Sequence, residues 1–442
     1  MKRIDTAIER SRELILEAER YIWRNPETGY KEFKTSRYMA EQFENLGYTL
    51  TYADGITGFY TVIDTGKPGP EVMVLGELDS IICPSHPESD PETGAVHSCG
   101  HNAQCAALLG VAAALKDPEV TEELCGRIRL CAVPAEELLE ISYRMELKKQ
   151  GKIKYLGGKS EFLRRGYFDG VDIAFMVHTG GKDFASNLGS VGCITKKIIY
   201  KGRAAHAGGS PHEGINALYA ATCGINAVNA LRETFKENDI IRFHPIVTEG
   251  GAMVNAIPET ATLESYVRGK SFDAIISENK KINRALIGAA LSLGANVEII
   301  DAPGYSPLLN SPDMIDLAED ALKLAAPDMP FVRTEAYSAG STDMGDLSCI
   351  MPVIHPYAPG STGKGHGNDY QIADPVSACV TNAKWQVAML KLLLENEGAR
   401  AYKIINGFNP QFTKEEFLAY QDAINRCGDR IVYEDDGAKI ML

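Results

Sequence analysis

Four separate segments of the chain carry side chains that could bind divalent metal ions and activate water. The first segment is His-Ser-Cys-Gly-His-Asn at 97–102, in which Cys99 and His101 lie two residues apart. A thiolate and an imidazole are ligands that suit zinc and similar ions. Gly100 permits a tight backbone bend that would let both side chains converge. Taken alone, the segment is equally typical of an ordinary loop with a buried cysteine.

The other three segments supply acids and further histidines. Glu136 and Glu137 follow an apolar run directly, His178 follows another, and His366 lies in a glycine-rich loop. One of two adjacent acids can bind a metal while its neighbour handles the proton of a water molecule. Each segment alone also fits a solvated acidic turn, a structural histidine or a surface loop. Together they supply enough ligands for two divalent ions, and chance explains that combination poorly.

The segments between these residues indicate an α/β domain. Short apolar runs at 72–76, 128–133 and 173–177 are typical of buried parallel strands. Helices are predicted over 6–47, with a break at 25–29, over the small residues of 103–116, and from residue 375. Strands that alternate with helices favour a mainly parallel sheet with helices on both faces. Acids and histidines at strand ends then lie at the sheet edge where open α/β folds bind ligands.

The pattern changes near residue 191. Strands at 193–201, 240–248, 260–268 and 296–301 alternate between polar and apolar residues, and helices are expected at 214–234 and 271–293. This pattern predicts a small α+β sandwich inserted into the larger domain. We therefore expect a catalytic domain formed by 1–190 and 306–442, interrupted by an insert at 191–305. The chain after residue 398 has no clear pattern.

Composition excludes several classes of function. The chain has 442 residues, with 45 basic and 59 acidic side chains and a formal charge of -14. This balance repels phosphate backbones and anionic membranes, so we expect no nucleic-acid or membrane partner. The N-terminal residues are charged and lack the apolar core of a signal peptide. Ten cysteines without a disulfide-like framework indicate reduced thiols, and a cytoplasmic location is expected.

The ordered set of motifs resembles the zinc-dependent aminoacylase, carnosinase and desuccinylase type of metallopeptidase, over roughly residues 10–395. The likeness is greatest to the branch of auxin-conjugate (N-acyl-amino-acid) amidohydrolases, aminobenzoyl-glutamate hydrolases and β-alanyl dipeptidases. The segments that carry it are 25–33 (NPETGYKEF), 76–79 (GELD), 97–102, 134–137, 175–178, 202–208 (GRAAHAG), 254–258 (VNAIP), 340–346 (GSTDMGD) and the loop around His366.

The resemblance implies a metal-dependent amidohydrolase or dipeptidase that cleaves the amide bond of an N-acyl amino acid or dipeptide with a free carboxylate. Two divalent ions per chain would be bound by Cys99, His101, Glu137, His178 and His366. Cysteine and histidine favour zinc, and manganese, cobalt or nickel can also occupy such a site. Glu136 would be the general base. Asp79 would orient a metal ligand.

The insert would be a lid and dimerisation domain, so the resemblance implies a homodimer. His206 would reach into a neighbouring active site and stabilise the oxyanion that develops during amide cleavage. Asn255 and Arg268 would hold the substrate carboxylate, since a guanidinium can pair with it bidentately. Ser341 and Thr342 would line the same pocket.

Three departures from the family pattern bear on the site. Other branches have a histidine ligand where this chain has Glu77, which leaves open whether Glu77 binds metal. Asn102 stands where auxin-conjugate members have aspartate, which favours the aminobenzoyl-glutamate and β-alanyl-dipeptide side of the branch. The segment 85–93, rich in proline and acids, precedes Cys99 and could reshape the pocket.

Functions of other classes fit the same residues less well. A cysteine-nucleophile hydrolase could use Cys99 with His101, but it leaves the acids at 136 and 137 unexplained. A non-catalytic binding protein of the same fold predicts missing ligands, whereas all five are present. A hydrolase of this fold that acts on a carbamoyl compound also remains open.

Overall fold

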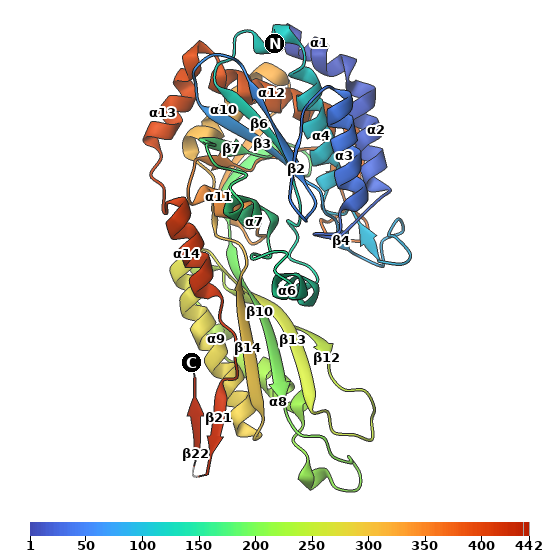
Figure 1. Cartoon of the computed structure of the whole chain (residues 1–442), viewed down its shortest axis with the longest axis vertical. Coiled ribbons are helices and arrows are strands. Elements are labelled where there is room, and N and C mark those ends of the chain that lie inside the picture. The colour runs from blue at the N-terminus through green and yellow to red at the C-terminus, as the bar shows by residue number, and fades with distance from the viewer. Residues whose placement is uncertain (436, 442) are drawn as a thin grey trace. The chain divides into compact units, whose positions relative to one another are not determined.

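The computed structural model describes residues 1–435 and 437–441, and they divide into two compact units (Figure 1). Unit 1 comprises Met1–Gly189, Leu308–Tyr337 and Thr342–Lys414. Unit 2 comprises Ser190–Pro307, Ser338–Ser341 and the chain from Glu415 onward. The last of these segments differs from the boundaries expected from the sequence, which assigned residues 306–442 to the catalytic domain.

Unit 1 is built on a six-stranded sheet with the order β1-β2-β6-β3-β7-β17. Its strands are β1 (Thr51–Tyr52), β2 (Phe59–Asp64), β3 (Glu71–Glu77), β6 (Arg127–Val133), β7 (Ile173–Phe175) and β17 (Val353–Ile354). β6, β3, β7 and β17 are parallel, and β2 joins β6 in the antiparallel sense. Every residue of β3 is buried, which explains the apolar run 72–76 between its terminal glutamates.

A core of apolar side chains joins this sheet to the main helices of unit 1. Unit 1 contains the helices α1 (Lys2–Arg10), α2 (Arg12–Trp23), α3 (Phe33–Asn45), α4 (His101–Ala114), α5 (Pro118–Thr121), α6 (Ile141–Lys149), α7 (Gly158–Arg164), α10 (Pro312–Ala325), α11 (Met344–Ser348), α12 (Asn382–Leu394) and α13 (Ala399–Gly407), and all but α6, α7 and α11 contribute to this core. α4 packs against β3 and lies beside α2 and α12. The helix expected from residue 375 begins as a π-helical turn, Val376–Thr381, and continues as α12.

A second, smaller sheet of unit 1 has the order β15-β9-β18-β8, with β16 paired to β9. Its strands are β8 (His178–Thr179), β9 (Phe184–Ser190), β15 (Leu308–Leu309), β16 (Phe331–Ser338) and β18 (Tyr357–Ala358). Two short pairs complete the unit, β4 (Ile81–Ile82) with β5 (Ala95–Val96) and β19 (Ser361–Thr362) with β20 (Gln371–Ile372). These short strands hold the loops that follow the parallel strands of the main sheet.

Unit 2 contains an antiparallel sheet with the order β11-β13-β10-β14, and β12 also pairs with β13. Its strands are β10 (Gly192–Lys201), β11 (Arg242–Phe243), β12 (Ile246–Glu249), β13 (Thr260–Gly269) and β14 (Asn296–Pro303). Helices α8 (Ala217–Asn229) and α9 (Phe272–Ser292) pack on this sheet and on each other. Buried and half-exposed residues alternate over 196–201 of β10 and 263–269 of β13, as expected for a sheet with one covered face.

The chain from Glu415 onward joins unit 2 because its apolar residues pack there. Helix α14 (Lys414–Ile424) runs beside α9, and the ring of Tyr420 meets that of Phe272 at 5.0 Å between centroids (Figure 1). Ile431, in the hairpin of β21 (Ile431–Glu434) and β22 (Gly437–Ile440), belongs to the unit 2 core. The backbone around Arg426 and Asp429 bridges to β14. This edge of the sheet is thereby covered.

The fold class predicted from the sequence, a mainly parallel α/β sheet with an α+β sheet domain, is confirmed. The predicted helix at 214–234 is shorter, because the chain from Arg232 turns into 3₁₀ segments (Arg232–Thr234 and Glu237–Asp239). The predicted strand at 240–248 is divided into β11 and β12. No described helix is long and apolar enough to cross a lipid bilayer.

Candidate metal centre

The candidate ligands of unit 1 converge at the carboxyl ends of the parallel strands. Glu77 ends β3, Glu136 and Glu137 follow β6, His178 follows β7 and His355 follows β17. Parallel strands bring these ends to one edge of the sheet, where open α/β folds bind ligands. Among the described residues, ligand atoms lie within 4.8 Å of one another in three groups: Cys99, His101 and His178; Cys99, Glu137 and His366; and Glu77, His101 and Glu136.

The tight turn before α4 positions Cys99 and His101. Gly100 has φ 93°, and a β-carbon there would collide with Thr179 and Tyr370. Only glycine can adopt this positive φ without strain and also leave the space that a β-carbon would fill. The predicted helix start at residue 103 is therefore two residues late, because α4 begins at His101. The first residue of α4 is therefore itself a candidate ligand, His101, since the chain enters the helix directly from the turn.

Backbone carbonyls orient the two histidines of the first group. His101 Nδ1 lies 2.9 Å from the carbonyl oxygen of Asp79, and His178 Nδ1 lies 2.8 Å from that of Thr179. Each Nδ1 therefore donates its hydrogen to a carbonyl, which leaves Nε2 available as a ligand. His178 Nε2 lies 3.3 Å from Cys99 Sγ. Metal-binding histidines commonly have one ring nitrogen hydrogen-bonded in this way, which fixes the tautomer and the orientation of the ring.

Asp79 holds the two adjacent glutamates through their backbone. Its carboxylate oxygens accept the backbone N–H groups of Glu136, at 3.1 Å, and Glu137, at 2.8 Å. Glu137 Oε1 then lies 3.0 Å from His366 Nε2. The loop that carries His366 is tied to the turn before α4, because the His366 N–H donates to the Ser98 carbonyl at 2.8 Å. A single buried carboxylate thus orders the turn that presents both glutamates.

The charges of the second group favour cation binding. Burial opposes ionisation of Glu137, yet His366 lowers the pKa of that carboxyl to about 2. Glu137 in turn raises the pKa of His366 to about 11. Burial and Glu137 oppose ionisation of Cys99, but His101 and His178 lower the pKa of the thiol to about 6. Anionic ligands therefore stand beside imidazoliums whose protons metal ions can replace.

Several buried atoms at the centre have no hydrogen-bond partner among the described residues. Two of them, His101 Nε2 and Glu77 Oε2, lie 3.2 Å apart. Buried polar atoms are nearly always partnered, so an unpartnered pair indicates a missing ligand or ion. Together with the mixed sulfur, nitrogen and oxygen donors, this observation shows that the residues present fit divalent metal ions.

Glu136 faces the same centre, but its pKa is shifted in the opposite direction from that of Glu137. Burial raises the pKa of the Glu136 carboxyl well above its ordinary value, and the carboxylates of Glu77 and Glu137 add to the effect. A carboxyl with a raised pKa takes up a proton more readily than its neighbours. The two adjacent glutamates are thus prepared for different tasks.

Lys159 and His355 also reach this centre, and neither was predicted from the sequence as a site residue. The Lys159 ammonium is fully buried and donates to Glu77 Oε1 at 2.5 Å and to Asp343. His355 is buried beside His178, with 5.6 Å between ring centroids, and neither of its ring nitrogens has a hydrogen-bond partner among the described residues. His355 shares the strand-end position of the other histidines, and that signal was available. Lys159 follows two glycines, and no pattern identifies it.

The Lys159 contact bears on the role of Glu77. Burial opposes ionisation of Glu77, but Lys159 and then His101 lower the pKa of its carboxyl to about 2. One oxygen of Glu77 is engaged by Lys159, and the other faces His101. Glu77 therefore has one oxygen left with which to approach a metal ion.

In unit 2, His206 is exposed and its tautomer follows from its contacts. His206 Nδ1 accepts the N–H groups of Gly208, at 3.1 Å, and Gly209, at 2.8 Å. A nitrogen that accepts two hydrogen bonds carries no proton, so in the neutral ring the hydrogen is on Nε2. Asn255 lies on the neighbouring segment, because its carbonyl accepts the Ala207 N–H at 2.9 Å. His206 thus presents a hydrogen-bond donor on the surface of unit 2.

The other predicted substrate residues are divided between the units. Within unit 2, the Arg268 guanidinium lies 3.4 Å from the carbonyl of Ala339 and 3.5 Å from Ser341 Oγ. Thr342 belongs to unit 1, where its hydroxyl accepts the Met344 N–H at 3.2 Å. That contact lies at the first turn of α11.

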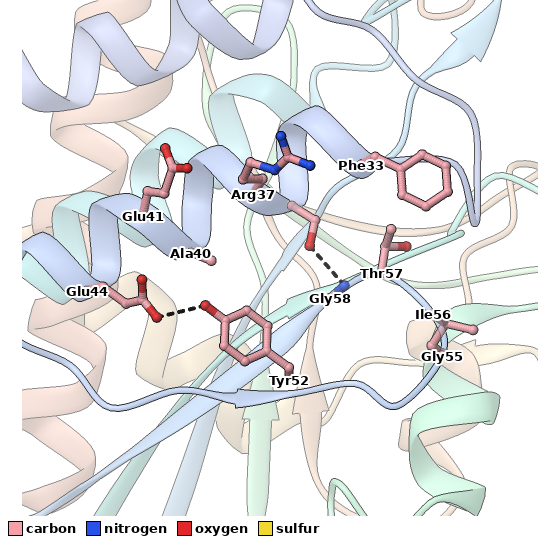
Figure 2. A pocket seen from close by; sticks show the side chains of 11 residues that line it. Phe33, Arg37, Ala40, Glu41, Glu44, Tyr52, Gly55, Ile56, Thr57 and Gly58 are labelled. Atoms are coloured by element: carbon pink, nitrogen blue, oxygen red, sulfur yellow. Dashed lines mark hydrogen bonds between the residues drawn. The ribbon is translucent and has the colours of Figure 1, made fainter.

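A hollow on the surface of unit 1 lies between α3 and the turn 55–58, with a volume of about 570 Å³ (Figure 2). Phe33, Arg37 and Tyr52 are among its lining residues, and none of the candidate ligands lines it. Its wall is nevertheless connected to the metal centre. Thr57 donates to buried Glu32 at 2.6 Å, and Glu32 accepts the Ala135 N–H at 2.8 Å, directly before the two glutamates.

Comparison with known proteins identifies similar sequences. A model of Peptidase family M20/M25/M40 matches residues 74–391. The Xaa-Arg dipeptidase of Mus musculus is 30% identical over 375 residues, which cover 80% of this chain and 78% of the mouse protein. A p-aminobenzoyl-glutamate hydrolase chain of Escherichia coli is 28% identical over 301 residues, which cover 67% of this chain and 59% of that protein.

Solved structures show the same fold. The crystal structure of a dinuclear metal binding peptidase of Bacillus subtilis matches with a TM-score of 0.61 and 20% identity. The match covers 89% of this chain and 99% of that structure. At this level of identity the likeness establishes the architecture.

Proposed function

The chain belongs to Peptidase family M20/M25/M40 and is a metal-dependent hydrolase of amide bonds, and we propose that its substrate is an N-acyl amino acid or dipeptide with a free carboxylate. The observation that carries the proposal is the convergence of Cys99, Glu137 and His366 with the other two candidate ligands beside buried Glu136. The names of the mouse and Escherichia coli relatives, a dipeptidase and an aminobenzoyl-glutamate hydrolase, support this substrate class.

We propose that two divalent ions are held by Cys99, His101, Glu137, His178 and His366, with zinc as the favoured metal. Cys99 belongs to two of the three groups of ligand atoms, which supports a binuclear centre. Bound there, such ions would acidify a water molecule and polarise the scissile carbonyl. The lowered pKa values of Cys99 and Glu137 mean that both ligands ionise at neutral pH. Manganese, cobalt or nickel would also be accepted.

Glu136 would be the general base. It is buried, its backbone is held by Asp79, and its raised pKa suits a group that accepts the proton of the attacking water. The same carboxyl would then deliver the proton to the leaving amine. Asp79 would act by positioning, since it binds the backbone of both glutamates and the Asp79 carbonyl orients His101.

His206 would donate its Nε2 hydrogen to the oxyanion. The tautomer set by the two glycine N–H groups supports this role. Arg268 and Asn255 would hold the substrate carboxylate, with Ser341 and Thr342 beside them. Arg268 supports a free-acid substrate because no carboxylate of the described residues pairs with it. Equal rates on an acid and its methyl ester would contradict this assignment.

We also propose that the protein is a cytoplasmic homodimer that associates through unit 2. β12 pairs with β13 on one side, and no other described strand pairs with it. Large apolar side chains are exposed on β12 and in the loop that follows it: Ile246, Val247, Met253 and Val254. An unpaired edge with apolar neighbours is a typical association surface. The ten free cysteines support a reducing compartment.

The deciding experiment combines metal analysis with substrate hydrolysis. Purified protein would be analysed for bound metal and then assayed with N-acetyl amino acids, aminobenzoyl-glutamate and β-alanyl dipeptides, before and after chelation and metal add-back. We expect about two ions per chain and activity that disappears with the chelator and returns with metal. Activity that resists chelation and is abolished by thiol alkylation would instead support a cysteine nucleophile.

A further inference from the structure

A cavity of about 600 Å³ lies entirely within unit 2, away from every residue given a catalytic role above. Residues of α9, β10, β14, the C-terminal helix α14 and the segment that follows it line the cavity. Apolar side chains form the walls, including Ile194, Ile276, Tyr420 and Ile424. Apolar walls with a few convergent polar groups are typical of sites for small molecules.

The floor of the cavity is polar and almost completely buried. Asp301 is 3% exposed, and its carboxylate accepts hydrogen bonds from Asn279 at 2.9 Å, from Asn283 at 3.1 Å and from the ammonium of Lys196. Lys196 is fully buried, so its charge balances that of Asp301. The floor is therefore electrically neutral.

One polar atom of this floor has no hydrogen-bond partner among the described residues. Asn279 lines the cavity and is 8% exposed, yet its Oδ1 is buried without a hydrogen-bond partner among the described residues. An amide oxygen in such a position normally has a donor. A ligand with an N–H or O–H group would supply it.

The rim of the cavity is cationic. Lys280, Arg284 and Arg426 line it, and none of the three forms an ion pair with any carboxylate of the described residues. Three unpaired cations around one cavity are unexpected in a chain with a formal charge of -14. The rim therefore attracts an anion to this part of an otherwise acidic surface.

We propose that this cavity is a second, non-catalytic ligand site, which binds a small amphiphilic carboxylate that carries a hydrogen-bond donor. The carboxylate meets the guanidinium of Arg284 or Arg426 at the rim, and the apolar body lies against the isoleucine and tyrosine walls. The donor satisfies Asn279 Oδ1. Because α14 and Arg426 come from the C-terminal segment, a bound ligand links that segment to α9 and β14.

Isothermal titration calorimetry on the full-length, metal-loaded protein tests this site with p-hydroxyphenylpropionate, which contains no amide bond to hydrolyse. We expect saturable binding that the neutral analogue p-hydroxyphenylpropanol lacks, and weaker binding of phenylpropionate, which has no hydroxyl donor. Arg284→Glu should weaken binding by roughly tenfold or more through charge reversal. Ala423→Trp should abolish it by filling the cavity, since Ala423 is exposed and lines it.

Two control variants separate this site from others. Lys236→Glu makes the same charge change at an exposed position of unit 2 outside the cavity, and Glu136→Gln alters the proposed catalytic base. Both should bind the probe like the wild type. Hydrogen exchange should also slow at 276–284 and 415–426 when the probe binds. No binding, equal binding of the neutral analogue, or affinity unchanged by Arg284→Glu and Ala423→Trp would overturn the proposal.

Discussion

The buried charges of the two units are arranged in opposite ways. In unit 1, Glu77, Glu136 and Glu137 crowd around His101 and Cys99, and buried atoms there lack partners among the described residues. In unit 2, Lys196 and Asp301 neutralise each other, and the side-chain amides of two asparagines also donate hydrogen bonds to the Asp301 carboxylate. Several carboxylates and a thiol that lie together around a few cationic groups favour the binding of added cations, whereas a matched pair does not. The contrast shows which buried cluster is prepared for metal ions.

The largest expected effect comes from the unit 1 cluster. Glu136→Gln keeps the shape of the side chain but removes its ability to take a proton. Turnover should fall by roughly a hundredfold to ten-thousandfold, while bound metal per chain stays at the wild-type value. Steady-state kinetics measures the turnover, and metal analysis measures the bound metal per chain. Retained turnover would remove Glu136 as the base, and lost metal would make it a ligand.

The unit 2 pair should affect stability alone. Lys196→Met leaves Asp301 buried without its counter-charge, and such a loss costs about 3–5 kcal/mol of unfolding free energy. We expect a loss of unfolding free energy at the lower end of this range, because Asn279 and Asn283 still donate to the Asp301 carboxylate. Denaturant unfolding measures the loss, with Lys236→Met as the exposed control. Adding Asp301→Leu to Lys196→Met should recover part of the lost unfolding free energy. A lower metal content in Lys196→Met would contradict the view that the unit 2 pair is independent of the metal centre.

His206→Ala should lower turnover by roughly a hundredfold, since loss of one oxyanion donor costs about 3 kcal/mol in the transition state. The loss should appear in kcat, with metal content and thermal stability unchanged because His206 is exposed. His212→Ala, at another exposed histidine of unit 2, is the matched control. Full activity of His206→Ala would exclude the proposed role.

Asp79→Asn should produce the smallest of these effects. An asparagine side chain has one acceptor oxygen for two backbone N–H groups, so the turn of Glu136 and Glu137 loses one of its contacts. Metal affinity should fall by roughly tenfold to a hundredfold. Competition with a chelating indicator measures it. An unchanged metal affinity together with lower stability would mean that Asp79 is only structural.

Much of unit 1 followed from local sequence. The apolar runs at 72–76, 128–133 and 173–177 lie within or overlap β3, β6 and β7, because continuous apolar segments of this length are typical of buried parallel strands. The five candidate ligands predicted from strand-end and loop positions lie together in the structure. The family and the amide-hydrolase activity predicted from the ordered motifs are confirmed.

Other features required the folded chain. Ser11 separates α1 from α2, although the apolar spacing predicted one continuous helix before the break at 25–29. Lys159 is 82 residues from Glu77 and 184 from Asp343, and no local pattern reveals that these charges meet. The C-terminal helix has an ordinary amphipathic sequence, which cannot indicate the unit against which its apolar face packs.

The order of the motifs was therefore enough to predict the family and its amide-hydrolase activity, because the ordered set is specific although each segment alone is not. Tertiary structure decided which partners each charge receives. It paired Glu77 with Lys159, left His101 Nε2 without a hydrogen-bond partner among the described residues, and brought the C-terminal segment against β14, where it lines the cavity of unit 2. These outcomes depend on contacts between residues far apart in the chain, and such contacts leave no periodic signal in the sequence.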